Sequence, residues 1–116
     1  MINKSNIILQ TSNNGISRIK LNEPNTYNSL SLNMLKSLIE SFKNFNNDDK
    51  TKVIIIEGLG KGFSAGHNLK EVRSLKKRSK YLKLFNLCSN LMLQIVEGRK
   101  PVIAKVHGAA MQLDVS

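Results

Sequence analysis

The sequence contains no tryptophan, and its aromatic residues are only four phenylalanines and two tyrosines. A core must therefore be built mainly from isoleucine, leucine and valine. Acidic residues are also scarce, with eight against 18 lysines and arginines, and the formal net charge is +10. This excess favours an anionic partner such as nucleic acid, a membrane surface or a phosphorylated small molecule. A length of 116 residues indicates one domain, or part of one.

Several protein classes are excluded by what is missing. A single cysteine, Cys88, cannot form an intramolecular disulfide. No apolar run approaches the ~20 residues that cross a bilayer. The segment 1–10 has neither the apolar region of a secretory signal nor the pattern of an organelle presequence. We therefore expect a cytoplasmic protein without a membrane span, with the mitochondrial matrix as the open alternative. No Cys/His cluster has zinc spacing, so no metal site is predicted.

Apolar patterning in the first half predicts a hairpin followed by a helix. The β-branched runs 7–9 and 16–21 flank Asn13-Asn14-Gly15, whose residues tolerate the positive φ angles of a tight turn. Ser31 is expected to cap the helix that follows. One apolar stripe at helical spacing then marks the buried face of that helix, and it consists of Leu35, Leu38, Ile39, Phe42 and Phe45.

The second half predicts a strand, a loop, a helix and a strand. Residues 53–56 are uniformly apolar and β-branched, which predicts a strand buried on both faces. The basic stretch 70–83 leads into a helix with an apolar stripe over 84–95, and its charges are expected on a solvated face. Residues 102–106 form the last predicted strand. The order is that of a mixed α/β fold.

The segment 58–69, Gly-Leu-Gly-Lys-Gly-Phe-Ser-Ala-Gly-His-Asn-Leu, carries the strongest chemical signal. It follows a strand end, the edge at which ligands bind in α/β sheets. Its small residues let a ligand approach the backbone, whose free N–H groups can donate to an oxygen. A glycine-rich turn without function is the alternative. Glu57 is expected to be a strand-end carboxylate facing solvent, and Cys88 a small core residue.

Three segments together resemble the crotonase superfamily, the enoyl-CoA hydratase/isomerase family. Residues 19–24 (Ile-Lys-Leu-Asn-Glu-Pro) with 28–31 (Asn-Ser-Leu-Ser) are similar to its opening motif. Residues 53–69 are similar to its glycine-loop signature, and 100–108 (Lys-Pro-Val-Ile-Ala-Lys-Val-His-Gly) to its third motif. The variant Gly66-His67-Asn68-Leu69 is most similar to the branch called enoyl-CoA hydratase domain-containing protein 3.

The resemblance implies a spiral of ββα turns that binds an acyl-coenzyme A thioester. Residues 1–116 would form the N-terminal half of one such domain. In the family, two backbone N–H groups form an oxyanion hole around the thioester carbonyl. The first donor would be Ala65, and Gly66, His67, Asn68 and Leu69 would line the acyl and pantetheine path. Ser29 would lie near the coenzyme A, which is part of the substrate, so no separate cofactor is implied.

The sequence also departs from the family pattern. The glycine cluster that supplies the second donor is missing after Gly108, and the two acid/base glutamates of hydratases are missing from the sequence as well. Asn68 replaces the commoner aspartate. His67 is expected to be a solvent-exposed loop residue unless it contacts substrate, and His107 a structural residue at a turn. We therefore expect a truncated chain with little hydratase activity and with apolar surface left exposed.

Two other functions stay open at this point. The chain could be catalytically inactive and act by binding or by associating with full-length relatives. The family forms homotrimers or hexamers, but its trimer contacts lie mainly in the C-terminal part that the matched segments do not include. A basic nucleic-acid-binding domain is the third possibility. Against it, the lysines are dispersed apart from one run, and no RNA-binding aromatic pattern is present, so no nucleic-acid partner is expected.

Overall fold

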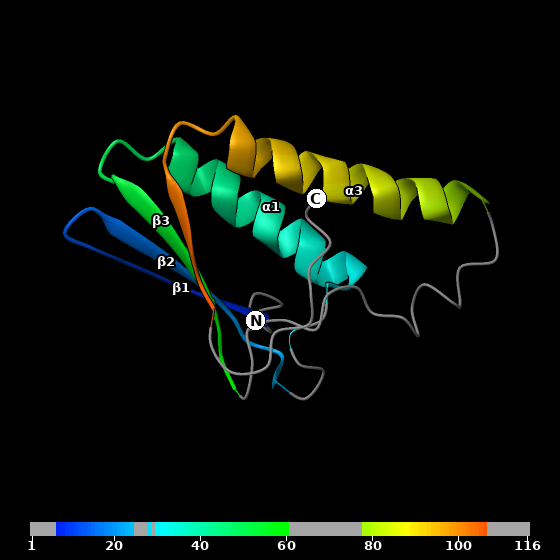
Figure 1. Ribbon diagram of the computed structural model, residues 1–116, viewed down its shortest axis with the longest axis horizontal. Helices are drawn as coiled ribbons and strands as arrows, with labels where there is room; N and C mark the ends of the chain where they lie inside the picture. The colour runs from blue at the N-terminus through cyan, green and yellow to red at the C-terminus, as the bar shows by residue number, and fades with distance from the viewer. Residues whose placement is uncertain (1–6, 25–27, 29, 61–77, 107–116) are drawn as a thin grey trace, which may run out of the picture.

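The computed structural model describes residues 7–24, 28, 30–60 and 78–106, and it has a mixed α/β fold (Figure 1). The elements follow the predicted order of strand, strand, helix, strand, helix and strand. Their bounds are β1 (Ile8–Asn13), β2 (Ile16–Leu21), α1 (Leu32–Asn46), β3 (Val53–Gly58), α3 (Arg78–Val96) and β4 (Val102–Lys105).

The four strands form one sheet in the order β1-β2-β3-β4. β1 and β2 are the predicted antiparallel hairpin, with Asn14 and Gly15 at φ angles of 53° and 84° in the turn. β1 extends to Asn13, well past the predicted end at Leu9. β2, β3 and β4 are parallel to one another, so their carboxyl ends share one edge of the sheet. Helical crossovers make this parallel arrangement possible.

Helix α1 begins where the sequence predicts. Ser31 is extended, with φ −73° and ψ 169°, and its Oγ accepts a hydrogen bond from the Met34 backbone N–H at 3.1 Å. This bond satisfies one of the N–H groups that have no partner within the helix. All five residues of the predicted apolar stripe are buried, and Met34 joins them. The helix ends at Asn46, inside the polar 46–49 stretch.

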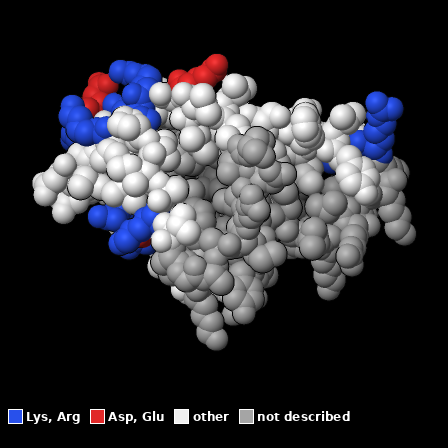
Figure 2. Space-filling model, viewed as in Figure 1, with Lys and Arg blue, Asp and Glu red and all other residues white. Residues whose placement is uncertain are grey.

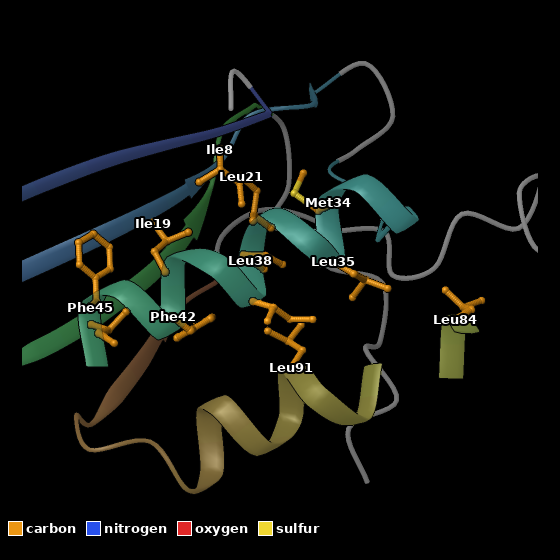
Figure 3. Close-up of a cluster of buried hydrophobic side chains, with 12 residues drawn as sticks. Ile8, Ile19, Leu21, Met34, Leu35, Leu38, Phe42, Phe45, Leu84 and Leu91 are labelled. Atoms are coloured by element: carbon orange, nitrogen blue, oxygen red, sulfur yellow. The ribbon is translucent and has the colours of Figure 1, made fainter. Parts of the chain in front are cut away.

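Helix α1 lies between the sheet and helix α3 (Figures 1 and 3). Figure 3 shows Ile8, Ile19 and Leu21 of the strands on one side of α1 and Leu91 of α3 on the other. A helix covered on two sides needs a wide apolar surface, which explains why nearly every second residue of α1 is buried. The buried apolar core consists of Ile8, Ile19, Leu21, Met34, Leu35, Leu38, Ile39, Phe42, Phe45, Ile54, Leu84 and Leu91.

Helix α3 uses the stripe that the sequence predicts. Leu84 and Leu91 are buried, and Cys88 packs against the core as a partly buried residue. Burial raises the pKa of the Cys88 thiol, which favours the neutral, unreactive form. The described part of the basic run, Arg78, Lys80 and Lys83, is exposed, as expected for a solvated helix face.

The prediction that strand 53–56 is buried on both faces is wrong. Ile54 is fully buried, but Val53, Ile55 and Ile56 are only partly so. The physical reason is the layering: α1, with α3 stacked on its other side, covers the sheet face that carries Ile54 and Ile56. Val53 and Ile55 alternate to the opposite face, where no described helix packs.

Several large apolar side chains are exposed in the described part of the chain. The most exposed are on α3 and at β4, which is an edge strand among the described strands. They are Phe85, Leu93, Val96, Ile103 and Val106. This agrees with the expected exposed apolar surface. An apolar strand edge and an apolar helix face both favour association with another chain.

Candidate functional site

The carboxyl ends of the three parallel strands bring the motif segments together. β2 ends at Leu21, β3 at Gly58 and β4 at Lys105. The opening motif continues from Leu21, the glycine loop from Gly58 and the third motif from Lys105. Segments far apart in the sequence therefore meet at one edge of the sheet, the edge at which open α/β sheets bind ligands.

A buried asparagine joins the first two of these segments. Asn28 is 0% exposed, and its Nδ2 donates to the Leu59 carbonyl oxygen at 2.9 Å. The Leu59 N–H in turn donates to the Leu21 carbonyl oxygen at 2.9 Å. On its other side, Asn28 Oδ1 accepts from the Glu23 N–H at 2.7 Å, and the Asn28 N–H donates to the Glu23 carbonyl oxygen at 2.8 Å. Both peptide groups of Leu59 are thus held at the start of the glycine loop.

A close backbone approach reinforces this link. Gly60 has φ +99°, a conformation that residues with a Cβ rarely adopt. A Cβ atom built on Gly60 would lie 2.7 Å from Cβ of Pro24. Glycine at this position therefore lets the beginning of the loop lie directly against the opening motif.

None of the predicted site residues lies in the described part of the chain. Ser29, Ala65, Gly66, His67, Asn68 and Leu69 fall outside the described residues, as do His107 and Gly108. Their roles stay predictions. The described structure instead shows that their neighbours are close: Asn28 contacts Leu59, and Pro24 lies against Gly60.

Sequence reasoning missed two residues of this edge. In the sequence, Asn28 stands out only as part of the Asn-Ser-Leu motif, and Gly60 only as one of several glycines. A signal for Asn28 was present, since asparagine tolerates positive φ and its amide can both donate and accept. Its φ of +54° uses the first property and its bonds to Glu23 and Leu59 use the second.

The prediction that Glu57 faces solvent is wrong. Its side chain is only 14% exposed, and Arg18, Lys20 and Lys105 each place a nitrogen 3.8–3.9 Å from its carboxylate oxygens. The sheet register causes this, because Lys20 on β2 and Lys105 on β4 lie directly beside Glu57 on β3. Three cations surround one anion, so part of the basic excess has a structural role on this sheet face.

Replacing Glu57 with glutamine should lower the free energy of unfolding by about 1 kcal/mol at low ionic strength. The distances exceed those of direct hydrogen bonds and the cations are partly solvated, so the pairing energy is mostly screened Coulomb attraction. Urea unfolding at low and high salt measures it, and the effect should shrink with salt. Glu40→Gln, an exposed carboxylate on α1, is the control. Equal effects of both substitutions would contradict this role for Glu57.

Other kinds of site find no support among the described residues. In that part of the chain, no group of three or more His, Cys, Asp or Glu side chains could hold a metal ion. Neither helix of the described residues is long and apolar enough to span a membrane. In Figure 2 the visible lysines and arginines gather at the left of the view and at its right-hand end, where α3 begins, and form no single patch.

Comparison with known proteins decides the family. The sequence profile described as Enoyl-CoA hydratase/isomerase matches residues 11–112. The chain belongs to this family. The resemblance read from the three motifs is therefore confirmed. The similarity to the branch called enoyl-CoA hydratase domain-containing protein 3 is also confirmed, as the relatives described next show.

Two curated relatives illustrate the match. The mitochondrial enoyl-CoA hydratase domain-containing protein 3 of Danio rerio is 41% identical over 106 residues, which cover 91% of this chain and 37% of the relative. The protein of the same name from Homo sapiens is 42% identical over 96 residues, 83% of this chain and 32% of the relative. The chain thus spans about a third of the length of these relatives, in their N-terminal part.

Solved structures show the same fold. The crystal structure of human enoyl coenzyme A hydratase domain-containing protein 3 matches with a TM-score of 0.83 at 38% identity, over 88% of this chain and 40% of that one. An enoyl-CoA hydratase from Mycobacterium smegmatis matches with a TM-score of 0.83 at 40% identity and the same coverage. The α/β arrangement is therefore crotonase-like over this portion.

Proposed function

We propose that this chain carries the part of a crotonase-type enzyme that binds an acyl-coenzyme A thioester and polarises its carbonyl group. Family membership supports the substrate class. The observation that carries the proposal is the bond from Asn28 Nδ2 to the Leu59 carbonyl oxygen, which joins the opening motif to the start of the glycine loop. In the family these two segments supply the coenzyme contact and the first oxyanion donor.

The proposed mechanism assigns the following roles. The Ala65 backbone N–H donates a hydrogen bond to the thioester oxygen and stabilises the negative charge of an enolate-like intermediate. Ser29 lies near the coenzyme, and residues 66–69 line the acyl and pantetheine path. Coenzyme A is carried by the substrate, so the reaction uses no separate cofactor. Lysine side chains supply point charges for its phosphates.

The experiment is a titration of the purified 116-residue chain with crotonyl-CoA. Calorimetry measures binding, and the loss of enoyl absorbance measures hydration. We expect saturable binding but hydration far slower than by a full-length member of the family. The reason is that the sequence lacks the second donor motif and both acid/base glutamates. Turnover near that of a full-length enzyme would contradict the expected low activity.

The same titration separates the alternatives. A single-stranded RNA is the comparison ligand, measured at low and high salt because phosphate contacts are salt-dependent. Salt-sensitive RNA retention without crotonyl-CoA binding would overturn the proposal in favour of a nucleic-acid-binding domain. Crotonyl-CoA binding that excess free coenzyme A competes away would support it.

A second candidate function is association without catalysis. The exposed apolar residues Phe85 on α3 and Ile103 on β4 favour it, because they offer a helix face and a strand edge to a partner of the same family. It predicts that the chain associates with such a partner and does not hydrate crotonyl-CoA. The cytoplasmic location expected from the sequence stays a prediction; the names of the relatives from Danio rerio and Homo sapiens include the word mitochondrial.

A further inference from the structure

Asn28 combines three features that a surface loop residue does not need. It is fully buried, it has a positive φ of 54°, and both ends of its side-chain amide are hydrogen-bonded. Positive φ in a non-glycine residue costs free energy, so the surrounding contacts must hold it there. The two bonds exchanged with Glu23 close the 23–28 loop, and they turn the Asn28 amide toward the end of β3.

The second end of the amide restrains the glycine loop at its origin. Asn28 Nδ2 donates to the Leu59 carbonyl oxygen, while the Leu59 N–H is bound to Leu21 at the end of β2. The next residue, Gly60, lies against Pro24. The peptide groups on both sides of Leu59 therefore have fixed orientations, and the direction in which the chain leaves the sheet is set by residues of the opening motif.

We propose that Asn28 is a positioning residue, which sets the spacing between the coenzyme-binding opening motif and the loop that carries the oxyanion donor. This inference rests on the proposed function. Its chemical reason is geometric: an oxyanion donor must lie about 2.7–3.1 Å from the oxygen that it stabilises. A displacement of about 1 Å can cost up to ~100-fold in rate. Asn28 touches neither the thioester nor the coenzyme in this scheme and acts through Leu59.

Two substitutions separate its bonds. Asn28→Asp keeps the acceptor for the Glu23 N–H and tolerates positive φ, but places a carboxylate oxygen against the Leu59 carbonyl oxygen. Asn28→Gly tolerates positive φ and removes both side-chain bonds without adding charge. Thr51→Ala is the matched control, because it also removes two side-chain hydrogen bonds of a buried residue, those to Ser17 and Asp48, and leaves the link to Leu59 intact.

The readout is butyryl-CoA labelled with ¹³C at the thioester carbonyl, bound to the full 116-residue chain under conditions where circular dichroism shows each variant folded. We expect the ¹³C shift on binding to wild type to report carbonyl polarisation. Both Asn28 variants should lose most of that shift and bind butyryl-CoA at least about tenfold more weakly. Thr51→Ala should keep both the ¹³C shift and the affinity for butyryl-CoA. A purely structural role for Asn28 would leave the shift at saturation unchanged.

Each outcome decides between the two proposals. If wild type itself neither binds butyryl-CoA nor shifts the label, the proposed function fails. If wild type does both and either folded Asn28 variant keeps the wild-type shift and affinity, the positioning role is overturned while the proposed function stands. If both Asn28 variants fail to fold while Thr51→Ala folds, Asn28 is a folding residue and the positioning role is likewise overturned.

Discussion

Replacement of Phe42 by alanine is expected to lower the free energy of unfolding by about 3–5 kcal/mol. Phe42 is the largest fully buried side chain of the described residues, at 0% exposed, and it belongs to the core on α1 (Figure 3). Because α1 lies between the sheet and α3, a cavity at this position has well-packed neighbours on two sides and collapses poorly. The free energy of unfolding of a domain is typically only about 5–15 kcal/mol, so this loss is a large share of it.

Urea unfolding followed by circular dichroism measures this effect. Phe85→Ala on α3 is the matched control, because Phe85 is 68% exposed and the substitution removes the same atoms. It should change the unfolding free energy by no more than about 0.5 kcal/mol. If the two substitutions cost the same, the layered core described here is incorrect.

Replacement of Gly60 by alanine is expected to affect both stability and ligand binding. The φ of +99° and the 2.7 Å approach of the added Cβ to Pro24 together should cost about 1–3 kcal/mol of unfolding free energy. The proline ring is rigid and cannot turn aside, so the loop must move away from the opening motif. On the proposed function, crotonyl-CoA affinity should fall at least about tenfold, which corresponds to ~1.4 kcal/mol.

Gly15→Ala separates the two consequences. Gly15 also has positive φ, at +84°, and its added Cβ would lie 2.9 Å from Cγ of Lys52. This glycine is in the β1–β2 turn, next to the start of β3 and away from its carboxyl end. Gly15→Ala should therefore lower the free energy of unfolding and leave the affinity for crotonyl-CoA unchanged. Denaturant midpoints and calorimetric titrations measure both quantities, and equal affinities for the two variants would count against a ligand site beside Gly60.

Much of the fold could be predicted because each helix and its cap is encoded locally. The stripe from Leu35 to Phe45 has helical period, and the hydroxyl of Ser31 is suited to the first turn. The hairpin followed from residues that tolerate positive φ at Asn14 and Gly15. Strand ends were less predictable, because backbone pairing extends β1 to Asn13 through polar residues that alternation does not mark.

The two wrong predictions, for strand 53–56 and for Glu57, concern which other parts of the fold cover a residue. The run 53–56 is apolar on both faces, yet only one face is packed by the described helices. Glu57 appeared to be a solvated strand end, because Arg18 and Lys105 are respectively 39 residues before and 48 residues after it in the sequence. Strand pairing brings these residues within 3.9 Å of the carboxylate. Local sequence contains no information on such distant neighbours.

For the candidate site too, some features follow from the sequence and others only from the tertiary structure. The sequence alone determined the family, since three motifs in order and spacing identify it and the profile over 11–112 agrees. It also determined the core stripe of α1 and the basic excess. Only the tertiary structure decided that Asn28 is buried, that its amide joins Glu23 to Leu59, and that Gly60 lies against Pro24. The physical reason is that periodicity and capping act within a few residues, whereas these contacts depend on parallel strands ending at a common edge.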